Sequence, residues 1–196
     1  MNPAIILASS SPFRQSILEK LQLPFSSFAP AIDETPQAQE TPEQLVRRLS
    51  EEKAKTAQQH FSHGLAIGSD QVAVFEQQIL GKPHNKENAV RQLSRFSGQR
   101  VEFLTGLCVY DIASGKFRSH VVPFSVHFRT LTAQQIDYYC EVEQPYQCAG
   151  SFKCEGLGIA LFEKLQGDDP NTLIGLPLIQ LTEMLLDFGV DVLSQQ

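Results

Sequence analysis

Residues 65–75 read LAIGSDQVAVF, an apolar run that is typical of a buried β-strand. Asp70 interrupts this run, and a buried acid costs free energy of desolvation unless a partner compensates for it. Two explanations are open at this point. The carboxylate could accept hydrogen bonds from backbone amides at a bulge, or it could face a metal ion, a cationic neighbour or a catalytic task. Side-chain alternation places Asp70 on one face of the strand and Ser69 and Gln71 on the other.

The sequence around this strand predicts a mixture of strands and helices. We expect strands at 4–8, 65–75, 100–110, 117–128 and 159–165, and helices at 12–21, 41–59, 85–97, 132–144 and 177–188. The order of these elements does not alternate strictly, and no stretch has the composition of a linker. This pattern predicts an α/β fold, a single domain over residues 1–196 built on a mixed sheet.

Composition excludes several classes of function. The chain has 196 residues, a net charge of −6 and a pI of about 5.3, so it has no global basic field for a nucleic-acid polymer. We find no signal peptide and no apolar run near the length of a membrane span, and we therefore expect a cytoplasmic protein. The four cysteines and five histidines show no zinc-site or redox-motif spacing.

Residues 9–14, SSSPFR, form a candidate phosphate site. They place Ser9, Ser10 and Arg14 around the start of a helix, where unpaired amides favour an anion. Arg14 adds a guanidinium fork that suits phosphate oxygens. The alternative is ordinary capping by Ser11 with a solvated Arg14.

Two lysines are candidate phosphate ligands. Lys53 shares one helix face with apolar residues at i+4 steps, namely Leu45, Leu49 and Ala57. Its side chain either points into a cleft or extends along the surface to solvent. Lys82 stands between Gly81 and Pro83 on a short rigid turn, and the alternative for it is a solvated loop lysine.

Acids and a glycine-rich segment complete the set. Asp33, Glu34 and Asp70 could bind Mg²⁺ or Mn²⁺, which need only one or two carboxylates when phosphate and water supply the other ligands. The alternative for Asp33 and Glu34 is a solvated acidic turn. Residues 150–158, GSFKCEGLG, imply close backbone approach or an ordinary flexible loop. Together with the cations, these groups are suited to metal-assisted cleavage of a phosphoanhydride.

With these residues, the chain resembles the Maf-like nucleotide pyrophosphatases from end to end. The matching motifs are LASSSPFR at 7–14, DE at 33–34, EKA at 52–54, GSDQ at 68–71, GKP at 81–83, CAGSF at 148–152 and NTLIGLP at 171–177. The resemblance implies an α/β fold with a mixed, elongated sheet flanked by helices, as in inosine triphosphate pyrophosphatases. It also implies a nucleoside triphosphate substrate, a divalent metal cation (Mg, Mn or Co), a cytoplasmic location and a possible homodimer.

Three positions distinguish branches of this family. Members acting on dTTP and UTP tend to have Thr where this chain has Gln71, and Gln where it has Glu155. The pattern found here is similar to the branch that hydrolyses 7-methyl-GTP. That branch often carries Trp at the position of Phe13, which keeps a stacking face but offers a weaker quadrupole to a cation.

The resemblance assigns roles to individual residues. It assigns catalysis to Asp70, Lys53 and Lys82, phosphate binding to Ser9, Ser10 and Arg14, base selection to Phe13, Gln71 and Glu155, and metal binding to Glu34 and Asp70. Asp70 would act as general base or hold a metal-bound water. A carboxylate at Glu155 independently suits a purine that N7-methylation has made cationic.

The sequence therefore predicts hydrolysis of 7-methyl-GTP to 7-methyl-GMP and pyrophosphate, by attack of water at the α-phosphorus. One alternative is a broader house-cleaning pyrophosphatase for other modified or canonical nucleotides. Another is a non-catalytic nucleotide sensor that regulates cell division through partners.

Overall fold

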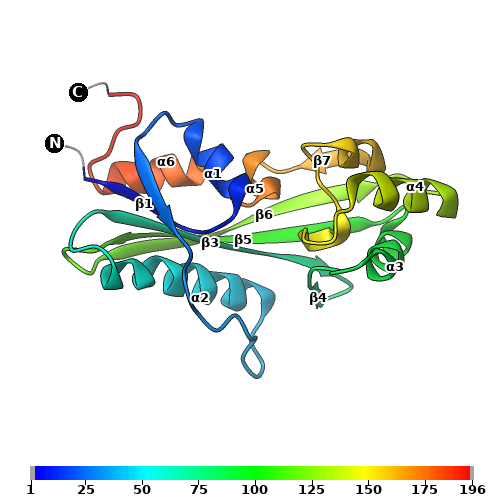
Figure 1. The fold of residues 1–196 in the computed structure, drawn as a ribbon, viewed down its shortest axis with the longest axis horizontal. Coiled ribbons are helices and arrows are strands. Elements are labelled where there is room, and N and C mark those ends of the chain that lie inside the picture. The colour runs from blue at the N-terminus through cyan, green and yellow to red at the C-terminus, as the bar shows by residue number, and fades with distance from the viewer. Residues whose placement is uncertain (1–2, 195–196) are drawn as a thin grey trace. The chain divides into compact units, whose positions relative to one another are not determined.

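The computed structural model describes residues 3–194 and has one mixed β-sheet with helices beside it (Figure 1). The strands are β1 Ile5–Ala8, β2 Phe25–Phe28, β3 Leu65–Phe75, β4 Gln78–Leu80, β5 Arg100–Asp111, β6 Phe117–Phe128 and β7 Phe162–Gln166. The α-helices are α1 Pro12–Glu19, α2 Pro42–Lys55, α3 Lys86–Phe96, α4 Ala133–Glu143, α5 Asn171–Ile174 and α6 Leu178–Asp187. Short 3₁₀ helices lie at Thr56–Gln59, Ala149–Ser151 and Leu157–Leu161.

The sheet has seven strands in the order β2-β1-β3-β5-β6-β7, with β4 paired to β3. Strand β1 runs parallel to β2 and β3, whereas β4 is antiparallel to β3 and β7 is antiparallel to β6. The predicted α/β class with a mixed sheet is confirmed. The chain divides into two compact units, a first of residues 1–70, 105–122 and 169–196, and a second of residues 71–104 and 123–168. The single domain over residues 1–196 stays a prediction.

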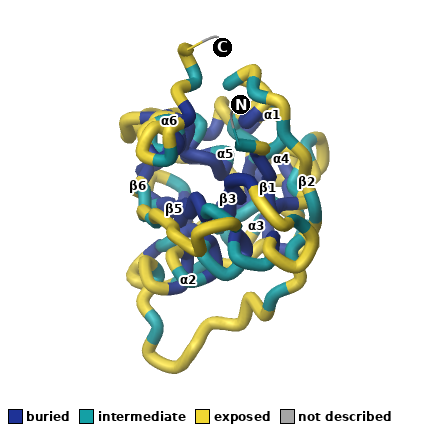
Figure 2. The backbone as a smooth tube through the Cα atoms, turned by 90° about the vertical axis from the view of Figure 1, so that its left-hand side faces the viewer, coloured by how far each residue is buried: buried dark blue, intermediate teal, exposed yellow. Residues whose placement is uncertain are grey.

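The first unit buries both faces of β1, β3 and β5. Alternation sends Ile5 and Leu7 to one face of β1 and Ile6 to the other, and β3 and β5 repeat this pattern. Apolar residues of α1 and α6 cover the face of Ile5, whereas Ala54 and Ala57 cover the face of Ile6. Figure 1 accordingly shows α1 and α6 on one side of β1 and α2 on the other. Figure 2 shows the buried strands between these helices.

Local sequence signals explain where the helices begin. The hydroxyl of Thr41 accepts from the amide of Gln44, and the side-chain oxygen of Gln44 accepts from the Thr41 amide at 2.9 Å, so α2 begins with a capping box. The side chain of Asn85 caps α3 by accepting from the Asn88 amide at 2.9 Å. Beyond the end of α3, Gly98 has a φ of +70°, the left-handed conformation that glycine favours.

The second unit is packed around aromatic rings. Phe96 contacts Phe75 and Phe128 with ring centroids 5.4 and 5.3 Å apart. Phe152 stacks edge-on against Phe103 and Phe162 at 5.3 and 4.8 Å. Such tilted and edge-to-face contacts are the favoured geometry of aromatic pairs. They anchor α3 and the segment after α4 within this unit.

One expectation about local structure was wrong. Residues 159–161 belong to a 3₁₀ helix, and the strand predicted to start there begins at Phe162. The backbone folds back tightly here, since a Cβ at Gly158 would lie 2.2 Å from the carbonyl oxygen of Lys153. Residues 167–170 connect β7 to the short helix α5, which begins at Asn171. Within residues 3–194, no helix has the length and apolar character needed to cross a bilayer.

Candidate active site

Lys53 joins two carboxylates in the first unit. Its Nζ atom lies 2.7 Å from Oδ1 of Asp70 and 2.6 Å from Oε1 of Glu34. The Lys53 and Asp70 side chains are only 8% and 13% exposed, whereas Glu34 is 59% exposed on the loop after β2. Asp70 therefore has a cationic neighbour, as one of its two explanations required. Lys53 does not extend to solvent, so that alternative was wrong.

A close approach of α2 to β3 explains how Lys53 reaches Asp70. A Cβ at Gly68 would lie 2.1 Å from the carbonyl oxygen of Ser50 and 2.7 Å from the amide nitrogen of Ala54. Only glycine allows this approach, because a larger residue would overlap with helix backbone. The predicted buried face of α2 is confirmed, with Leu45, Leu49, Lys53 and Ala57 all buried.

An arginine on α2 holds the exposed loop that carries Glu34. The Nε and Nη2 atoms of Arg48 donate to the two carboxylate oxygens of Glu40 at 2.7 and 2.9 Å. Nη2 also donates to the carbonyl oxygen of Thr35 at 3.1 Å. Because Thr35 follows Glu34 directly, these contacts fix the backbone next to the carboxylate that pairs with Lys53.

Ionisation of this loop follows from the same contacts. The hydrogen bond from Arg48 lowers the pKa of Glu40 below its usual value of 4.5. A hydrogen bond from Thr35 lowers the pKa of Asp33. The loop therefore remains acidic at neutral pH. Figure 2 shows it as an exposed excursion beside α2.

The start of α1 is anchored to Gly175. Arg14 Nε and Ser69 Oγ both donate to the carbonyl oxygen of Gly175, each at 2.9 Å. Ser11 caps the helix by accepting from the Arg14 amide, and Ser9 is 5% exposed with its hydroxyl accepting from the Ser11 amide. Capping is thus present, but Arg14 is held against the fold instead of being solvated.

Burial and nearby carboxylates shift the pKa of Arg14 in opposite directions. Burial lowers the pKa of the Arg14 guanidinium, and the carboxylates of Asp70 and Glu34 raise it. The guanidinium of Arg14 thus interacts electrostatically with the same two acids that contact Lys53. The first unit consequently combines two cations, two acids and the amide-rich start of a helix, the groups needed to bind a phosphate chain and accept a proton from water.

The second unit holds the other predicted cation on a fixed turn. Lys82 is exposed, and side chains of α3 hold the residues on either side of it. Gln92 Nε2 donates to the carbonyl oxygen of Gly81 at 3.0 Å, and Asn88 Nδ2 donates to that of Pro83 at 2.8 Å. The rigid turn expected from glycine and proline is thus fixed by two amides.

The loop carrying Glu155 is also held from a helix. Glu143, the last residue of α4, accepts from the Leu157 amide at 2.7 Å, and its carbonyl oxygen accepts from Lys153 Nζ at 2.7 Å. Glu155 itself is exposed, and Cys154 Sγ lies 3.5 Å from its Oε2 atom. Burial, followed by the Glu155 carboxylate, raises the pKa of Cys154 to about 12. This thiol is therefore inert at neutral pH.

The predicted site residues fall into both units. The first unit contains Ser9, Ser10, Phe13, Arg14, Glu34, Lys53 and Asp70, and the second contains Gln71, Lys82 and Glu155. The structure brings Glu34, Lys53 and Asp70 into direct contact. Ser10 is exposed and Phe13 is 39% exposed.

Sequence reasoning missed the residues that hold this set. These are Arg48, Glu40, Gln92, Asn88, Glu143 and the carbonyl oxygen of Gly175. Arg48 and Glu52 have the i,i+4 spacing of a helix ion pair, and Arg48 Nη1 lies 3.3 Å from Glu52 Oε2. That spacing was the one sequence signal available for Arg48. It indicates an ion pair within the helix and does not indicate the contacts of Arg48 with the loop.

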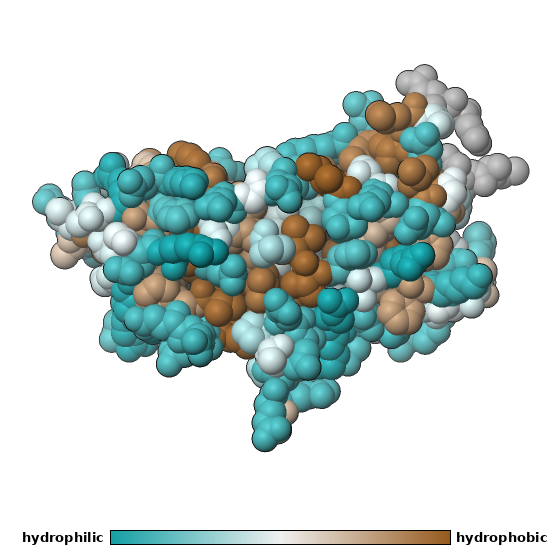
Figure 3. Space-filling view, turned by 180° about the vertical axis from the view of Figure 1, so that it is seen from behind, coloured by the Kyte–Doolittle hydropathy of each residue, from teal (hydrophilic) through white to brown (hydrophobic). Residues whose placement is uncertain are grey.

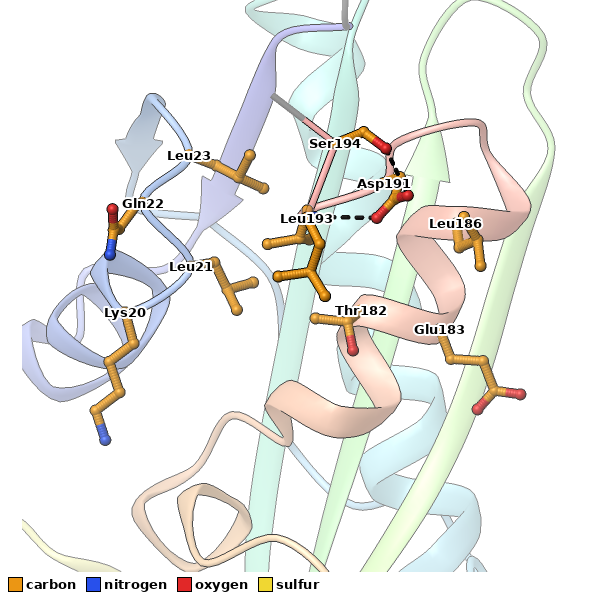
Figure 4. Close-up of a pocket in the computed structure, with 11 residues that line it drawn as sticks. Lys20, Leu21, Gln22, Leu23, Thr182, Glu183, Leu186, Asp191, Leu193 and Ser194 are labelled. Atoms are coloured by element: carbon orange, nitrogen blue, oxygen red, sulfur yellow. Dashed lines mark hydrogen bonds between the residues drawn. The ribbon is translucent and has the colours of Figure 1, made fainter. Parts of the chain in front are cut away.

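A separate groove lies elsewhere in the first unit. It has a volume of about 980 Å³, and its lining combines leucines with polar residues, including Leu21, Leu186, Asp191 and Leu193 (Figure 4). Its described lining includes none of the predicted site residues. Leu193 is 92% exposed. Figure 3 shows a group of hydrophobic residues at the upper right of the face that it draws. Among its described lining residues, Lys20 is the only cation, which is fewer than a phosphate chain requires.

Comparison with known proteins identifies the protein family to which the chain belongs. Residues 4–188 match the family described as Maf-like protein, so the chain belongs to this family. It is 66% identical over 196 residues to the 7-methyl-GTP pyrophosphatase of Pseudoalteromonas translucida, covering all of this chain and 97% of that protein. It is 58% identical over 192 residues to the 7-methyl-GTP pyrophosphatase of Colwellia psychrerythraea, covering 98% and 96% of the two chains.

A solved structure supports the fold. The Staphylococcus aureus Ham1 protein superposes with a TM-score of 0.51 at 13% identity, covering 95% of this chain and all of that one. This likeness confirms the fold class predicted from the sequence.

Proposed function

We propose that the protein hydrolyses 7-methyl-GTP to 7-methyl-GMP and pyrophosphate. The observation that carries this proposal is the contact of buried Lys53 with Asp70 and Glu34, which combines a base with a phosphate-binding cation. The two relatives named 7-methyl-GTP pyrophosphatase match essentially the whole chain, so their activity is the natural expectation for it.

The residues of the first unit have complementary tasks in this reaction. Asp70 accepts the proton of the water that attacks the α-phosphorus. Lys53 and Arg14 carry positive charge that stabilises the negative charge developing on the phosphate oxygens. The start of α1, with Ser9 and Ser10, supplies further donors to the phosphate chain. In the second unit, Lys82 is the cation proposed for the leaving pyrophosphate.

The acids of the first unit fit a divalent metal cation. Residues 3–194 contain no cluster of three or more His, Cys, Asp or Glu side chains suited to metal binding. Glu34 and Asp70 nevertheless converge on one cation, the Lys53 ammonium, at 2.6 and 2.7 Å. Mg²⁺ is typically bound by one or two carboxylates together with substrate phosphates and water. A metal held there would neutralise phosphate charge and lower the pKa of bound water.

Base selection rests on Glu155, Gln71 and Phe13. The carboxylate of Glu155 is exposed and held on a fixed loop, and it favours a purine that carries positive charge and N–H donors. The exposed ring of Phe13 offers a face for stacking. These roles are part of the same proposal, which also includes a cytoplasmic location and a homodimer.

A pyrophosphate-release assay tests the proposal. Purified protein is mixed with 7-methyl-GTP, GTP, dTTP or UTP, with Mg²⁺, with Mn²⁺ or with EDTA. We expect metal-dependent pyrophosphate release that is fastest with 7-methyl-GTP. Equal rates with all four nucleotides would indicate a broader house-cleaning enzyme. Tight nucleotide binding without pyrophosphate release would indicate a non-catalytic regulator and overturn the proposal.

A further inference from the structure

Gln92 on α3 bonds to two separate turns of the second unit. Its Nε2 atom donates to the carbonyl oxygen of Gly81 at 3.0 Å, and its Oε1 atom accepts from the hydroxyl of Ser151. Gly81 precedes Lys82, and Ser151 lies in the turn before the loop of Glu155. One neutral amide thus connects the turn of a proposed phosphate ligand with the turn of a proposed base-selecting residue.

The first of these turns is fixed at both of its ends. Asn88 lies one helical turn before Gln92 on the same face of α3, and it donates to the carbonyl oxygen of Pro83 at 2.8 Å. The two amides therefore hold the carbonyl groups on both sides of Lys82. Lys82 itself is exposed, so packing does not hold its side chain. The position of its backbone therefore determines which region the ammonium can reach.

The second turn is strained and buried. Gly150 has a φ of +74°, and Ser151 has a φ of +60°, a conformation that non-glycine residues rarely adopt. A Cβ at Gly150 would lie 2.7 Å from the Phe103 ring, and Ser151 is completely buried. The hydrogen bond to Gln92 gives the buried hydroxyl of Ser151 its partner and helps to hold the strained backbone.

We propose that Gln92 is a positioning residue that couples recognition of the phosphates by the Lys82 turn to recognition of the base by the loop after Ser151. This inference rests on the function proposed above. The hydrogen bonds of the Gln92 side chain go to Gly81 and Ser151 and not to Lys82 Nζ or Glu155, so it acts through the two turns. Disturbing it should therefore change both phosphate binding and nucleotide preference, whereas disturbing either partner should change only one of them.

Three variants separate these effects without changing charge. Asn88→Ala loosens the Lys82 turn alone, and it should raise KM for 7-methyl-GTP, GTP and UTP in the same proportion. Ser151→Ala loosens the second turn alone, and it should lower the ratio of kcat/KM for 7-methyl-GTP to that for GTP. Gln92→Met should do both. We expect each change to be about two- to tenfold, the effect of one lost neutral hydrogen bond.

Gln134→Met is the matched control, because Gln134 is exposed on α4 in the same unit. It should leave KM and the nucleotide preference unchanged. If Gln92→Met does not fold, the contrast between Asn88→Ala and Ser151→Ala still tests whether the two turns have separate roles. Equal effects of these two variants on KM and on preference would overturn the proposal.

Amide hydrogen exchange provides a measurement that does not depend on activity. Gln92→Met should speed exchange in residues 81–84 and in residues 148–152, whereas Ser151→Ala should speed it only in the latter. Unchanged exchange in both segments would overturn the proposal, and so would faster exchange with unchanged kinetics. If the wild-type protein releases no pyrophosphate from any nucleotide, the proposed function fails, while the exchange data still decide whether Gln92 links the two turns.

Discussion

Lys53 in the first unit and Lys82 in the second are held by different kinds of interaction. In the first unit, Lys53 contacts Asp70 and Glu34 through ion pairs of 2.7 and 2.6 Å. In the second, the neutral amides of Gln92 and Asn88 hold backbone carbonyl groups. The first arrangement places charge directly, whereas the second places a loop that carries charge.

This difference predicts different consequences of mutation. Removing one member of the charged set leaves another buried charge without its partner, which costs much more than the loss of a neutral hydrogen bond. The largest effects should therefore arise in the first unit and act on turnover. Smaller effects should arise in the second unit and act on the choice of nucleotide.

Asp70→Asn should have the largest effect. The amide of asparagine cannot accept a proton from water, so we expect turnover to fall by about 10²- to 10⁴-fold, the usual contribution of a general base. Asparagine keeps the size and an acceptor oxygen, so nucleotide binding should be largely retained. Rates of pyrophosphate release and calorimetric titration with 7-methyl-GTP provide the two measurements.

Asp168→Asn is the control for this variant, because Asp168 is exposed in the turn before α5. It should match the wild-type protein in turnover. Full activity of Asp70→Asn would remove Asp70 from the mechanism and with it the contrast between the two units.

Lys53→Met should lower turnover less but reveal the metal site. Loss of one charged contact to phosphate should slow the reaction by about ten- to a hundredfold. Asp70 and Glu34 would then lack their shared ammonium, so a divalent cation should compensate. We expect Mn²⁺ alone, without nucleotide, to bind this variant more tightly and raise its Tm more than that of the wild-type protein.

Lys55→Met is the matched control, since Lys55 lies on the same helix but pairs with Glu51 at 3.4 Å. Mn²⁺ should affect it as it affects the wild-type protein. If Mn²⁺ binds Lys53→Met more weakly than the wild-type protein, the two carboxylates do not form the proposed metal site.

Glu155→Gln tests the second unit. A hydrogen bond to a charged group is roughly twice as strong as a neutral one, so we expect the preference for 7-methyl-GTP over GTP to fall by about three- to tenfold. Turnover of GTP should change little. Glu163→Gln, an exposed residue of β7, provides the same change of charge as a control. An unchanged preference would exclude Glu155 from base selection.

Periodicity and capping signals were sufficient to predict most of the fold. Strand β3 was predictable from its apolar run and helix α2 from the i+4 spacing of its apolar residues, and Thr41 and Asn85 mark helix starts by local hydrogen bonds. The 3₁₀ helix at Leu157–Leu161 and the short helix α5 were not predicted. Tertiary contacts decide such short elements, and these contacts leave no periodic pattern.

The residues of the candidate site also differ in how far the sequence could predict them. Lys53 was predictable because the i+4 spacing put it on the buried face of α2, and Asp70 because an acid is anomalous in an apolar strand. The carbonyl oxygen of Gly175, which binds Arg14, lies 161 residues away in sequence. Gln92 is a neutral side chain bonded to backbone, so neither its type nor its spacing distinguishes it from a solvated glutamine.

The smallest expected effect concerns how the loop of Glu34 is held. Because Arg48 lowers the pKa of Glu40 below 4.5, ionised Glu40 stabilises the fold above that pH. Glu40→Gln should therefore unfold at a lower denaturant concentration at pH 7, and the difference should vanish as the pH falls through the depressed pKa of Glu40. Glu183 is exposed on α6 and takes no part in this contact, so the stability of Glu183→Gln should not show this dependence on pH. A difference that persists at low pH would mean that packing, and not charge, fixes this loop, and the two units would then be held alike.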